Sequence, residues 1–200
     1  MKTKTLEKIK AAKDKMHAKR EGKEKGLYIL HTGMGKGKTS AAMNMVYRHL
    51  AHGKRAAVVQ FVKSTDAFDS GDRLMLEKLK AMGMPVSIDV MGGGFTWETQ
   101  DPDADRRCAA AAFEQAVKHI QNPDIDLVLL DEIHIALSHQ QIDLEPVKEA
   151  IAARPAMTHI VTTGRRAPDG LLEMADLVTD FKKVKHPISA GIPAQIGIEY

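Results

Sequence analysis

Cysteine is nearly absent from this chain of 200 residues, which has only Cys108. A single cysteine cannot form a disulfide within the chain, and it cannot supply the several thiolates of a cysteine-built zinc site. No apolar run approaches the roughly 20 residues that a membrane helix needs, and no apolar stretch follows the N-terminal lysines as it would in a secretory signal. We therefore expect a cytoplasmic protein that neither spans a membrane nor is secreted.

Aromatic residues are also scarce, at 4% of the chain, and positive charge is unevenly placed. Residues 1–25 hold ten Lys or Arg and four Asp or Glu, a net charge of +6; since the whole chain carries +3, residues 26–200 carry −3. A basic segment can bind nucleic acid, but residues 1–25 contain no aromatic side chain on which bases could stack. We expect a solvated, partly helical arm at residues 1–25 and no nucleic-acid partner.

From residue 26 onward, short β-rich runs alternate with helical stretches, which is typical of a parallel sheet built from βαβ units. Most of the expected strands are nearly continuous apolar runs, as in strands that are covered on both faces. We expect one α/β domain over residues 26–200, with a mostly parallel sheet and helices on both of its faces. The expected strands are Leu27–His31, Ala56–Val62, Val86–Val90, Leu127–Leu130, His159–Thr163 and Leu177–Phe181, and the expected helices lie near Lys38–Ala51, Asp72–Met82, Pro102–Ile120, Leu144–Ala153 and Gly170–Ala175.

A segment rich in glycine and lysine directly follows the first expected strand and precedes a helix. It reads Gly33-Met34-Gly35-Lys36-Gly37-Lys38-Thr39-Ser40. In such a P-loop, glycines let backbone N–H groups approach phosphate oxygens, and the helix directs the positive end of its dipole at the same anion. Lys38 adds a charge beside the phosphates, where we expect it in solvent and not in the core, and the Thr39 hydroxyl can ligate Mg²⁺. The strict pattern has glycine where this chain has Thr32. The segment predicts triphosphate binding in a P-loop NTPase-like (RecA-like) fold but does not specify the reaction.

A second motif is the apolar strand Leu127–Leu130 that ends in Asp131 and Glu132. In P-loop proteins an aspartate in this place holds Mg²⁺ opposite the P-loop hydroxyl. Alone, such a strand end is common and would fit a helix cap, but beside a P-loop it favours a metal role for Asp131. Glu132 has two interpretations, because it could activate water in an ATPase or orient the water shell of the magnesium ion.

A third motif, Gly92-Gly93-Gly94-Phe95-Thr96-Trp97-Glu98-Thr99-Gln100, contains the only tryptophan of the chain and follows an expected strand. The carboxyl ends of strands in α/β sheets are where ligands bind. Phe95 and Trp97 either cover the edge of the sheet or contact a large, flat, partly apolar ligand. Their spacing does not decide between the two.

These three motifs resemble the ATP:corrinoid adenosyltransferases of the P-loop type, a family in which Thr32 is typical. The resemblance extends to Thr163-Gly164-Arg165 and to the C-terminal stretches Val184–Pro187 and Ala194–Tyr200, so it spans nearly all of residues 26–200. The chain departs from the family at Met34, where asparagine is usual, at Ser40, and at His134-Ile135. The resemblance implies transfer of the 5′-deoxyadenosyl group of ATP to a reduced Co(I) corrinoid with release of triphosphate, in adenosylcobalamin biosynthesis or salvage.

The resemblance also implies roles for single residues. Lys38, Phe95 and Trp97 would act in catalysis, the two aromatics by leaving cobalt four-coordinate, and Thr39 and Asp131 would hold Mg²⁺ or Mn²⁺. The implied partners are ATP, the corrinoid, a reductant protein such as a flavodoxin or flavin reductase, and a second copy of the chain, with the arm over the partner's site. The implied nucleotide contacts are Gly33, Met34, Gly35, Lys36, Gly37, Lys38, Thr39, Ser40, Glu132 and Arg165.

Two other functions are compatible with the P-loop alone, because a fold does not determine a reaction. A small-molecule kinase or ATPase would transfer a phosphoryl group and release ADP. A RecA-like nucleic-acid-binding ATPase would bind DNA or RNA through the basic arm, with a strong dependence on salt.

Overall fold

The structure, a computed structural model, describes residues 24–64, 70–92 and 101–199. Its strands are β1 (Tyr28–Thr32), β2 (Ala56–Ser64), β3 (Val86–Gly92), β4 (Leu127–Asp131), β5 (His159–Thr163) and β6 (Leu177–Asp180). Its helices are α2 (Lys38–Ala51), α3 (Gly71–Ala81), α5 (Pro102–Gln121), α6 (Ile133–Ser138), α7 (Leu144–Ala152), α8 (Asp169–Met174) and the 3₁₀ helix η1 (Pro187–Ala190).

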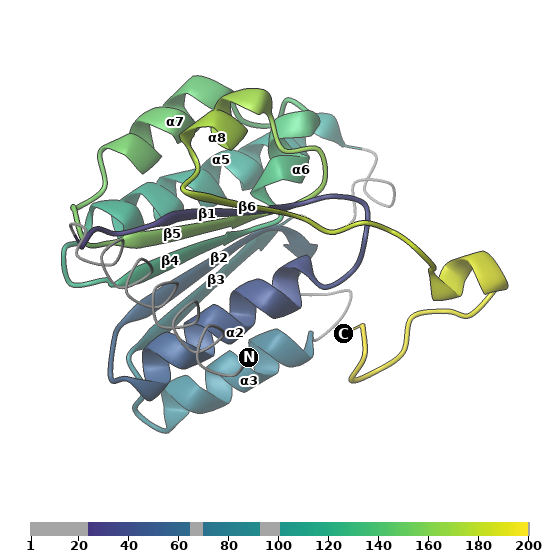
Figure 1. Cartoon of the computed structure of the whole chain (residues 1–200), viewed down its shortest axis with the longest axis horizontal. Helices are drawn as coiled ribbons and strands as arrows, with labels where there is room; N and C mark the ends of the chain where they lie inside the picture. Colours follow the sequence, from purple (N-terminus) through teal and green to yellow (C-terminus); the bar gives the residue numbers. More distant parts are fainter. Residues whose placement is uncertain (1–23, 65–69, 93–100, 200) are drawn as a thin grey trace, which may run out of the picture.

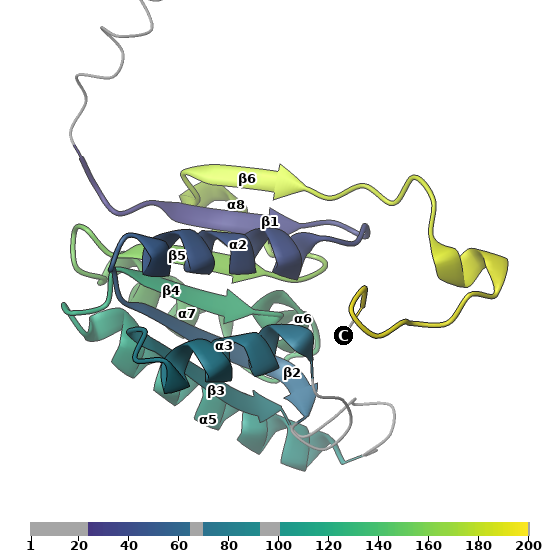
Figure 2. The same ribbon diagram turned by 90° about the horizontal axis from the view of Figure 1, so that it is seen from below.

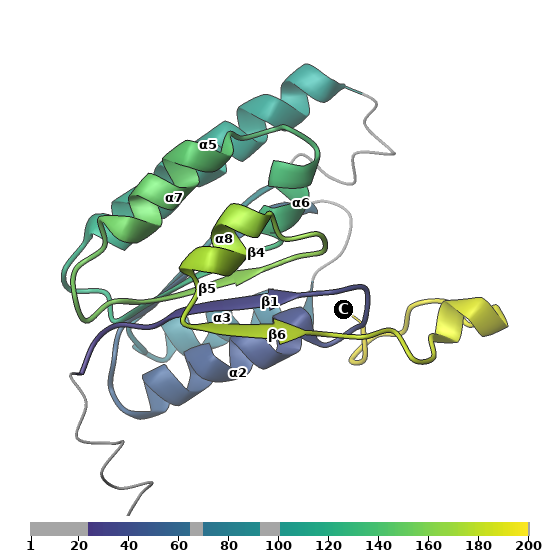
Figure 3. The same cartoon turned by 45° about the horizontal axis from the view of Figure 1, so that its top comes forward.

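The six strands form one sheet in the order β3-β2-β4-β5-β1-β6, and each neighbouring pair is parallel. Helices α5, α6, α7 and α8 cover one face of the sheet, and α2 and α3 cover the other (Figure 1). Turning the molecule makes this three-layer arrangement plain (Figure 3). The expected α/β fold with helices on both faces is confirmed.

Each strand divides its side chains between two cores, because successive residues of a strand point to opposite faces. In β4, Val128 and Leu130 pack toward α5 and α7, whereas Leu127 and Leu129 pack toward α2 and α3. All four are fully or almost fully buried. This double burial explains why the β4 sequence is a continuous apolar run rather than an alternating one.

Local sequence signals account for where several helices begin. The Asp101 carboxylate caps α5 by accepting from the N–H groups of Asp103 and Ala104 at 3.1 and 3.0 Å, and Pro102 occupies the first turn. The Ser70 hydroxyl oxygen caps α3 by accepting from the N–H of Arg73 at 3.2 Å. Such caps satisfy backbone N–H groups that have no partner within the helix.

Because the strands are parallel, their carboxyl ends meet at one edge of the sheet. The loops after β1, β4 and β5 leave from this edge, as does the chain that follows β6 (Figure 2). After β6 the chain runs away from the sheet, forms η1 and returns, so that its C-terminal end lies near the same edge (Figure 1). We call residues 181–199 the C-terminal tail.

The structure differs from the sequence-based expectations in two elements and several bounds. The helices α6 and η1 were not expected. The six residues of α6 are mostly apolar, and four of them are buried: Ile133, His134, Ala136 and Leu137. Only Ser138 at its C-terminal end is exposed, so the segment lacks the periodicity by which a helix is identified in a sequence. Strand β1 begins one residue later than expected, and β6 ends at Asp180 instead of Phe181.

The expected arm, residues 1–25, lies almost entirely outside the described residues. Over the parts of the chain that the structure does describe, no helix combines the length and the apolar character required to cross a membrane.

Candidate nucleotide and metal site

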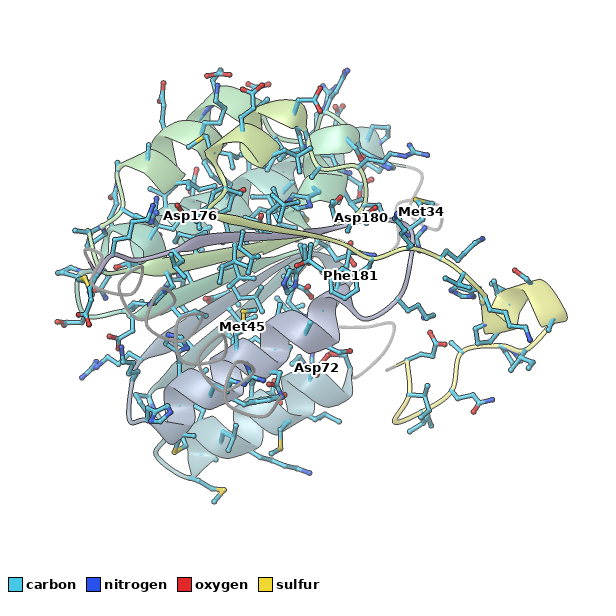
Figure 4. The ribbon with its side chains drawn as sticks, in the orientation of Figure 1. Met34, Met45, Asp72, Asp176, Asp180 and Phe181 are labelled. Atoms are coloured by element: carbon cyan, nitrogen blue, oxygen red, sulfur yellow. The ribbon has the colours of Figure 1, made fainter. Side chains whose placement is uncertain are left out.

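The loop between β1 and α2 is the segment that the sequence predicts to hold phosphate, and the chain that leaves β6 braces it. The N–H of Gly35 donates to the carbonyl oxygen of Phe181 at 2.5 Å. A Cβ on Gly35 would lie 2.6 Å from that oxygen, so only glycine permits the approach. Asp180 and Phe181 lie at the end of β6 nearer the P-loop residue Met34, whereas Asp176 lies at the opposite end of the strand (Figure 4).

The side chain of Lys38, the first residue of α2, turns back onto its own loop. Its Nζ donates to the carbonyl oxygens of Gly33 and Gly35 at 2.9 and 2.7 Å, and the residue is only 7% exposed. The expectation that this ammonium group lies in solvent is therefore wrong, because the loop carbonyls enclose it. Burial lowers the pKa of Lys38 below its usual value, although the nearby Glu132 carboxylate acts in the opposite direction.

Asp131, the last residue of β4, accepts hydrogen bonds from three neighbouring elements. Its Oδ1 accepts from the hydroxyls of Thr39 and Thr163 at 2.9 and 2.7 Å, and its Oδ2 accepts from the Gln60 amide at 3.0 Å. Asp131 is fully buried. The structure thus brings together Thr39 and Asp131, the two residues proposed as metal ligands from the sequence. It adds Gln60 and Thr163 from β2 and β5, the strands on either side of β4.

The donor set at Asp131 fits a magnesium ion. A carboxylate and a hydroxyl are hard oxygen ligands, and Mg²⁺ in nucleotide sites commonly takes one or two protein oxygens and keeps several waters. Across residues 24–64, 70–92 and 101–199, no three or more His, Cys, Asp or Glu side chains are grouped to hold a metal. The protein's share of such a site would therefore be the oxygens of Thr39 and Asp131.

Glu132 and Arg165 stand at the ends of β4 and β5 and face the same space. The N–H of Glu132 donates to the Thr163 hydroxyl oxygen at 2.9 Å, and the Glu132 backbone has a φ of 65°. This left-handed conformation is uncommon outside glycine, and it turns the chain sharply from β4 into α6. Arg165 is exposed.

The C-terminal tail closes one side of this space, because Lys36 of the P-loop forms an ion pair with Glu199. The cavity is half open to solvent and has a volume of about 410 Å³. Its walls come from the P-loop and α2, the start of α3, the ends of β4 and β5, and the tail: Gly35, Lys36, Gly37, Lys38, Thr39, Ser40, Gly71, Asp72, Glu132, Arg165, Gly197, Ile198 and Glu199.

The cavity contains most of the nucleotide contacts implied by the sequence, but not all. Gly33 and Met34 are not among its lining residues, and the Met34 side chain is 49% exposed. Phe95 and Trp97 lie outside the described residues. Gln60 and Glu199 were not singled out from the sequence. Gln60 could have been found as a polar residue within an apolar strand, whereas nothing in the sequence pairs Glu199 with the P-loop.

The family model described as "ATP:corrinoid adenosyltransferase BtuR/CobO/CobP" matches residues 24–200 of this chain. A corrinoid adenosyltransferase from Pseudomonas aeruginosa is 45% identical over 195 residues, which is 98% of this chain and 93% of the relative. The corrinoid adenosyltransferase CobA of Salmonella typhimurium is 39% identical over 177 residues, covering 88% of this chain and 87% of the relative.

Among solved structures, the flagellar accessory protein FlaH from Methanocaldococcus jannaschii is similar in fold, with a TM-score of 0.50. The two share 12% sequence identity, and the match covers 80% of this chain and 72% of the other. At this identity the likeness concerns the fold alone.

Proposed function

This chain belongs to the ATP:corrinoid adenosyltransferase family, and from that premise we propose how its residues carry out the transfer of the 5′-deoxyadenosyl group from ATP to a Co(I) corrinoid. The observation that supports this most directly is one cavity, of about 410 Å³, that is lined by Lys36, Lys38 and Arg165. Glu132 and Thr39 line it too, and the Thr39 hydroxyl donates to the buried Asp131 carboxylate behind the wall. Three cations around one cavity suit the binding of a highly charged triphosphate.

The reaction requires a good leaving group more than a protein nucleophile. The electron pair of Co(I) forms the Co–C bond to C5′ of ATP, and the C5′–O bond breaks with its electron pair passing to the triphosphate. Cobalt is oxidised from Co(I) to Co(III) in this step, and no proton transfer is needed. The protein therefore contributes most by stabilising the charge that develops on the departing triphosphate.

Lys38 is positioned to do this. Its ammonium group is held 2.9 and 2.7 Å from two loop carbonyls at the cavity wall. Phosphate oxygens carry charge and are stronger acceptors than carbonyls, so bound triphosphate would draw Nζ away from the loop. Arg165 and Lys36 would add charge at the same cavity, with Lys36 exchanging its ion pair with Glu199 for a phosphate oxygen.

Thr39 and Asp131 would hold Mg²⁺, or Mn²⁺, beside the phosphates. When bound, the ion supplies positive charge that favours departure of the triphosphate. Gln60 and Thr163 would keep the Asp131 carboxylate in one orientation through the hydrogen bonds described above. Glu132 would orient the water shell of the ion, and not activate a water for attack.

The corrinoid would lie along the edge of the sheet toward the end of β3, where residues 93–100 begin. Strands β3 and β1 are four positions apart in the sheet, or roughly 19 Å at the usual spacing of strands, a span suited to a large flat ligand. We propose that Phe95 and Trp97 contact the corrin and leave its cobalt without an axial ligand. We also propose a homodimer, a flavodoxin or flavin reductase as reductant, and action in the cytoplasm.

The test is anaerobic incubation of the protein with ATP, Mg²⁺ and a chemically reduced corrinoid. The expected products are a light-sensitive Co–C compound and inorganic triphosphate in equal amounts, with no product when the corrinoid is left out. The Lys38→Ala variant is the matched control for protein-independent reaction. ADP and phosphate as products, formed equally well without corrinoid, would instead identify phosphoryl transfer.

A further inference from the structure

His134, in α6, is a buried residue that the chemistry above does not use. Its ring is fully buried, with Nδ1 3.2 Å from the carbonyl oxygen of Gly164 and Nε2 3.0 Å from the Thr162 hydroxyl. A carbonyl oxygen can only accept, so Nδ1 carries the proton and donates to Gly164. Burial lowers the pKa of His134 to about 4. The ring is therefore neutral at neutral pH, and Nε2 accepts a hydrogen bond from Thr162.

The Nε2 side of the ring leads into the core. The Thr162 hydroxyl donates to His134 and thus accepts from the phenolic hydroxyl of Tyr28, which lies 3.1 Å away. These two hydrogen bonds connect α6 to β5 and β1 on the face of the sheet that α5 to α8 cover. They end in the core and reach no residue that lines the cavity.

The Nδ1 side leads to the loop that carries Arg165. This loop is held at both of its ends by β1. The N–H of Gly164 donates to the carbonyl oxygen of His31, and the N–H of Ala167 donates to the Thr32 hydroxyl, both at 3.2 Å. The bond from His134 to the Gly164 carbonyl is a third restraint, and it acts on the peptide unit that directly precedes Arg165.

The backbone of this loop needs such restraint. Gly164 has a φ of 140° and Arg166 a φ of 56°, both in the region that side chains rarely adopt. A Cβ on Gly164 would lie 2.7 Å from the Cβ of His134, so the loop packs directly against this residue. His134 also follows Glu132 by two residues. It thus joins the two chain segments, after β4 and after β5, that present Glu132 and Arg165 to the cavity.

We propose that His134 is a positioning residue for ATP: its Nδ1–H holds the Gly164 carbonyl so that the Arg165 guanidinium stays at the nucleotide cavity. The inference rests on the proposed contact between Arg165 and the triphosphate.

Two substitutions separate the two sides of the ring, because an amide can replace one ring nitrogen at a time. In His134→Asn the amide NH₂ lies near the Nδ1 position and can still donate to Gly164. In His134→Gln the amide extends to the Nε2 position and can retain the bond to Thr162 only. Thr162→Val is the matched control, since it removes the core side of the network and leaves Gly164 untouched.

The measurement is kcat/KM for ATP and KM for the corrinoid, with Co(I) supplied by a chemical reductant, and a thermal unfolding curve for each variant. We expect His134→Gln to lower kcat/KM for ATP about tenfold with little change in KM for the corrinoid. His134→Asn should stay within about threefold of the wild type. Thr162→Val should lower the unfolding temperature but keep kcat/KM for ATP near that of the wild type.

The double variant with Arg165→Ala tests whether His134 acts through Arg165. Arg165→Ala alone should lower kcat/KM for ATP about a hundredfold, and His134→Gln should then have almost no additional effect. An additional tenfold loss would overturn the proposal, as would equal losses in the Asn, Gln and Thr162→Val variants. An Arg165→Ala variant with normal kcat/KM for ATP would overturn the triphosphate contact itself, and the inference with it.

If His134→Gln yields no folded protein, Thr32→Val tests the same loop from its other end, at Ala167. It should lower kcat/KM for ATP severalfold in the wild-type background and hardly at all in the Arg165→Ala background. A loss of the same size in both backgrounds would contradict positioning through Arg165.

Discussion

Replacing Asp131 by asparagine separates the two roles of this side chain, since asparagine has the same shape and no charge. The carboxylate accepts from the hydroxyls of Thr39 and Thr163 on one oxygen and from the Gln60 amide on the other. An asparagine could keep its oxygen toward the two hydroxyls and place its NH₂ toward Gln60. Gln60 could then rotate its own amide by 180° and accept instead of donate.

All three hydrogen bonds can thus be retained, so we expect Asp131→Asn to change the free energy of unfolding by about 1 kcal/mol or less. Asp131→Ala is the contrasting variant. It leaves two buried donors, the Thr163 hydroxyl and the Gln60 amide, and the part-buried Thr39 hydroxyl without this acceptor. At roughly 1–3 kcal/mol for each buried donor it should cost at least about 2 kcal/mol. Loss of the negative charge should impair the metal site in both variants and lower kcat by roughly 10²–10³-fold.

Urea unfolding and steady-state adenosylation at several Mg²⁺ concentrations provide the measurements. Gln60→Leu in the Asp131→Asn background is a further control. It removes the amide that would accept from the NH₂ of the new asparagine, so this double variant should be less stable than Asp131→Asn alone. The reasoning is refuted if Asp131→Asn is as unstable as Asp131→Ala. It is also refuted if Asp131→Asn keeps wild-type activity and Mg²⁺ dependence.

Three further predictions follow from other parts of the molecule. Lys38→Ala should remove roughly 2–4 kcal/mol of transition-state stabilisation and also lower the unfolding temperature, because it leaves the carbonyl oxygens of Gly33 and Gly35 without their ammonium donor; near-normal turnover at saturating ATP would contradict this. Burial lowers the pKa of His134 to about 4, below the value of about 6.5 in an unfolded chain. The neutral imidazole therefore contributes fully to the free energy of unfolding above about pH 6.5, and this contribution is lost as the pH falls toward 4. Compared with His134→Asn, the wild type should therefore lose roughly 3 kcal/mol between pH 7 and pH 4, and a constant difference in unfolding free energy would exclude the effect. Phe95→Ala should lower activity with a mild, protein-delivered reductant far more than with a strong chemical one; an unchanged ratio of the two activities together with a lower unfolding temperature would leave Phe95 as a packing residue.

Much of the fold could be predicted because it depends on short-range patterns. The apolar runs around Val58, Leu129 and Val161 are strands covered on both faces, and each lies where the sequence placed it. The P-loop and the strand ending in Asp131 were recognisable for the same reason. A strand, a turn and a helix that follow one another in the chain are encoded by neighbouring residues, and parallel pairing brings their functional ends to one edge.

The local signals failed where a segment's structure depends on what surrounds it. Four of the six residues of α6 are buried where this short helix packs against β2 and β5, so no amphipathic pattern indicates it. Lys38 was expected in solvent because lysine is rarely buried. It is buried because the side chain folds back and two carbonyls of the loop that directly precedes it enclose its ammonium group, a contact that composition cannot indicate.

By itself, the sequence determined the class of fold, through the alternation of strand and helix patterns along residues 26–200. It also located the P-loop and the carboxylate at the end of β4, since each of these is written in fewer than a dozen consecutive residues. Only the tertiary structure decided that Gln60 and Thr163 hold Asp131, that Glu199 pairs with Lys36, and that His134 supports the loop before Arg165. The alternation of side chains along a strand predicts which residues share a face of the sheet, but it does not predict which strands are neighbours in the sheet. That order, and with it these long-range contacts, arises from packing six strands and their helices into one sheet.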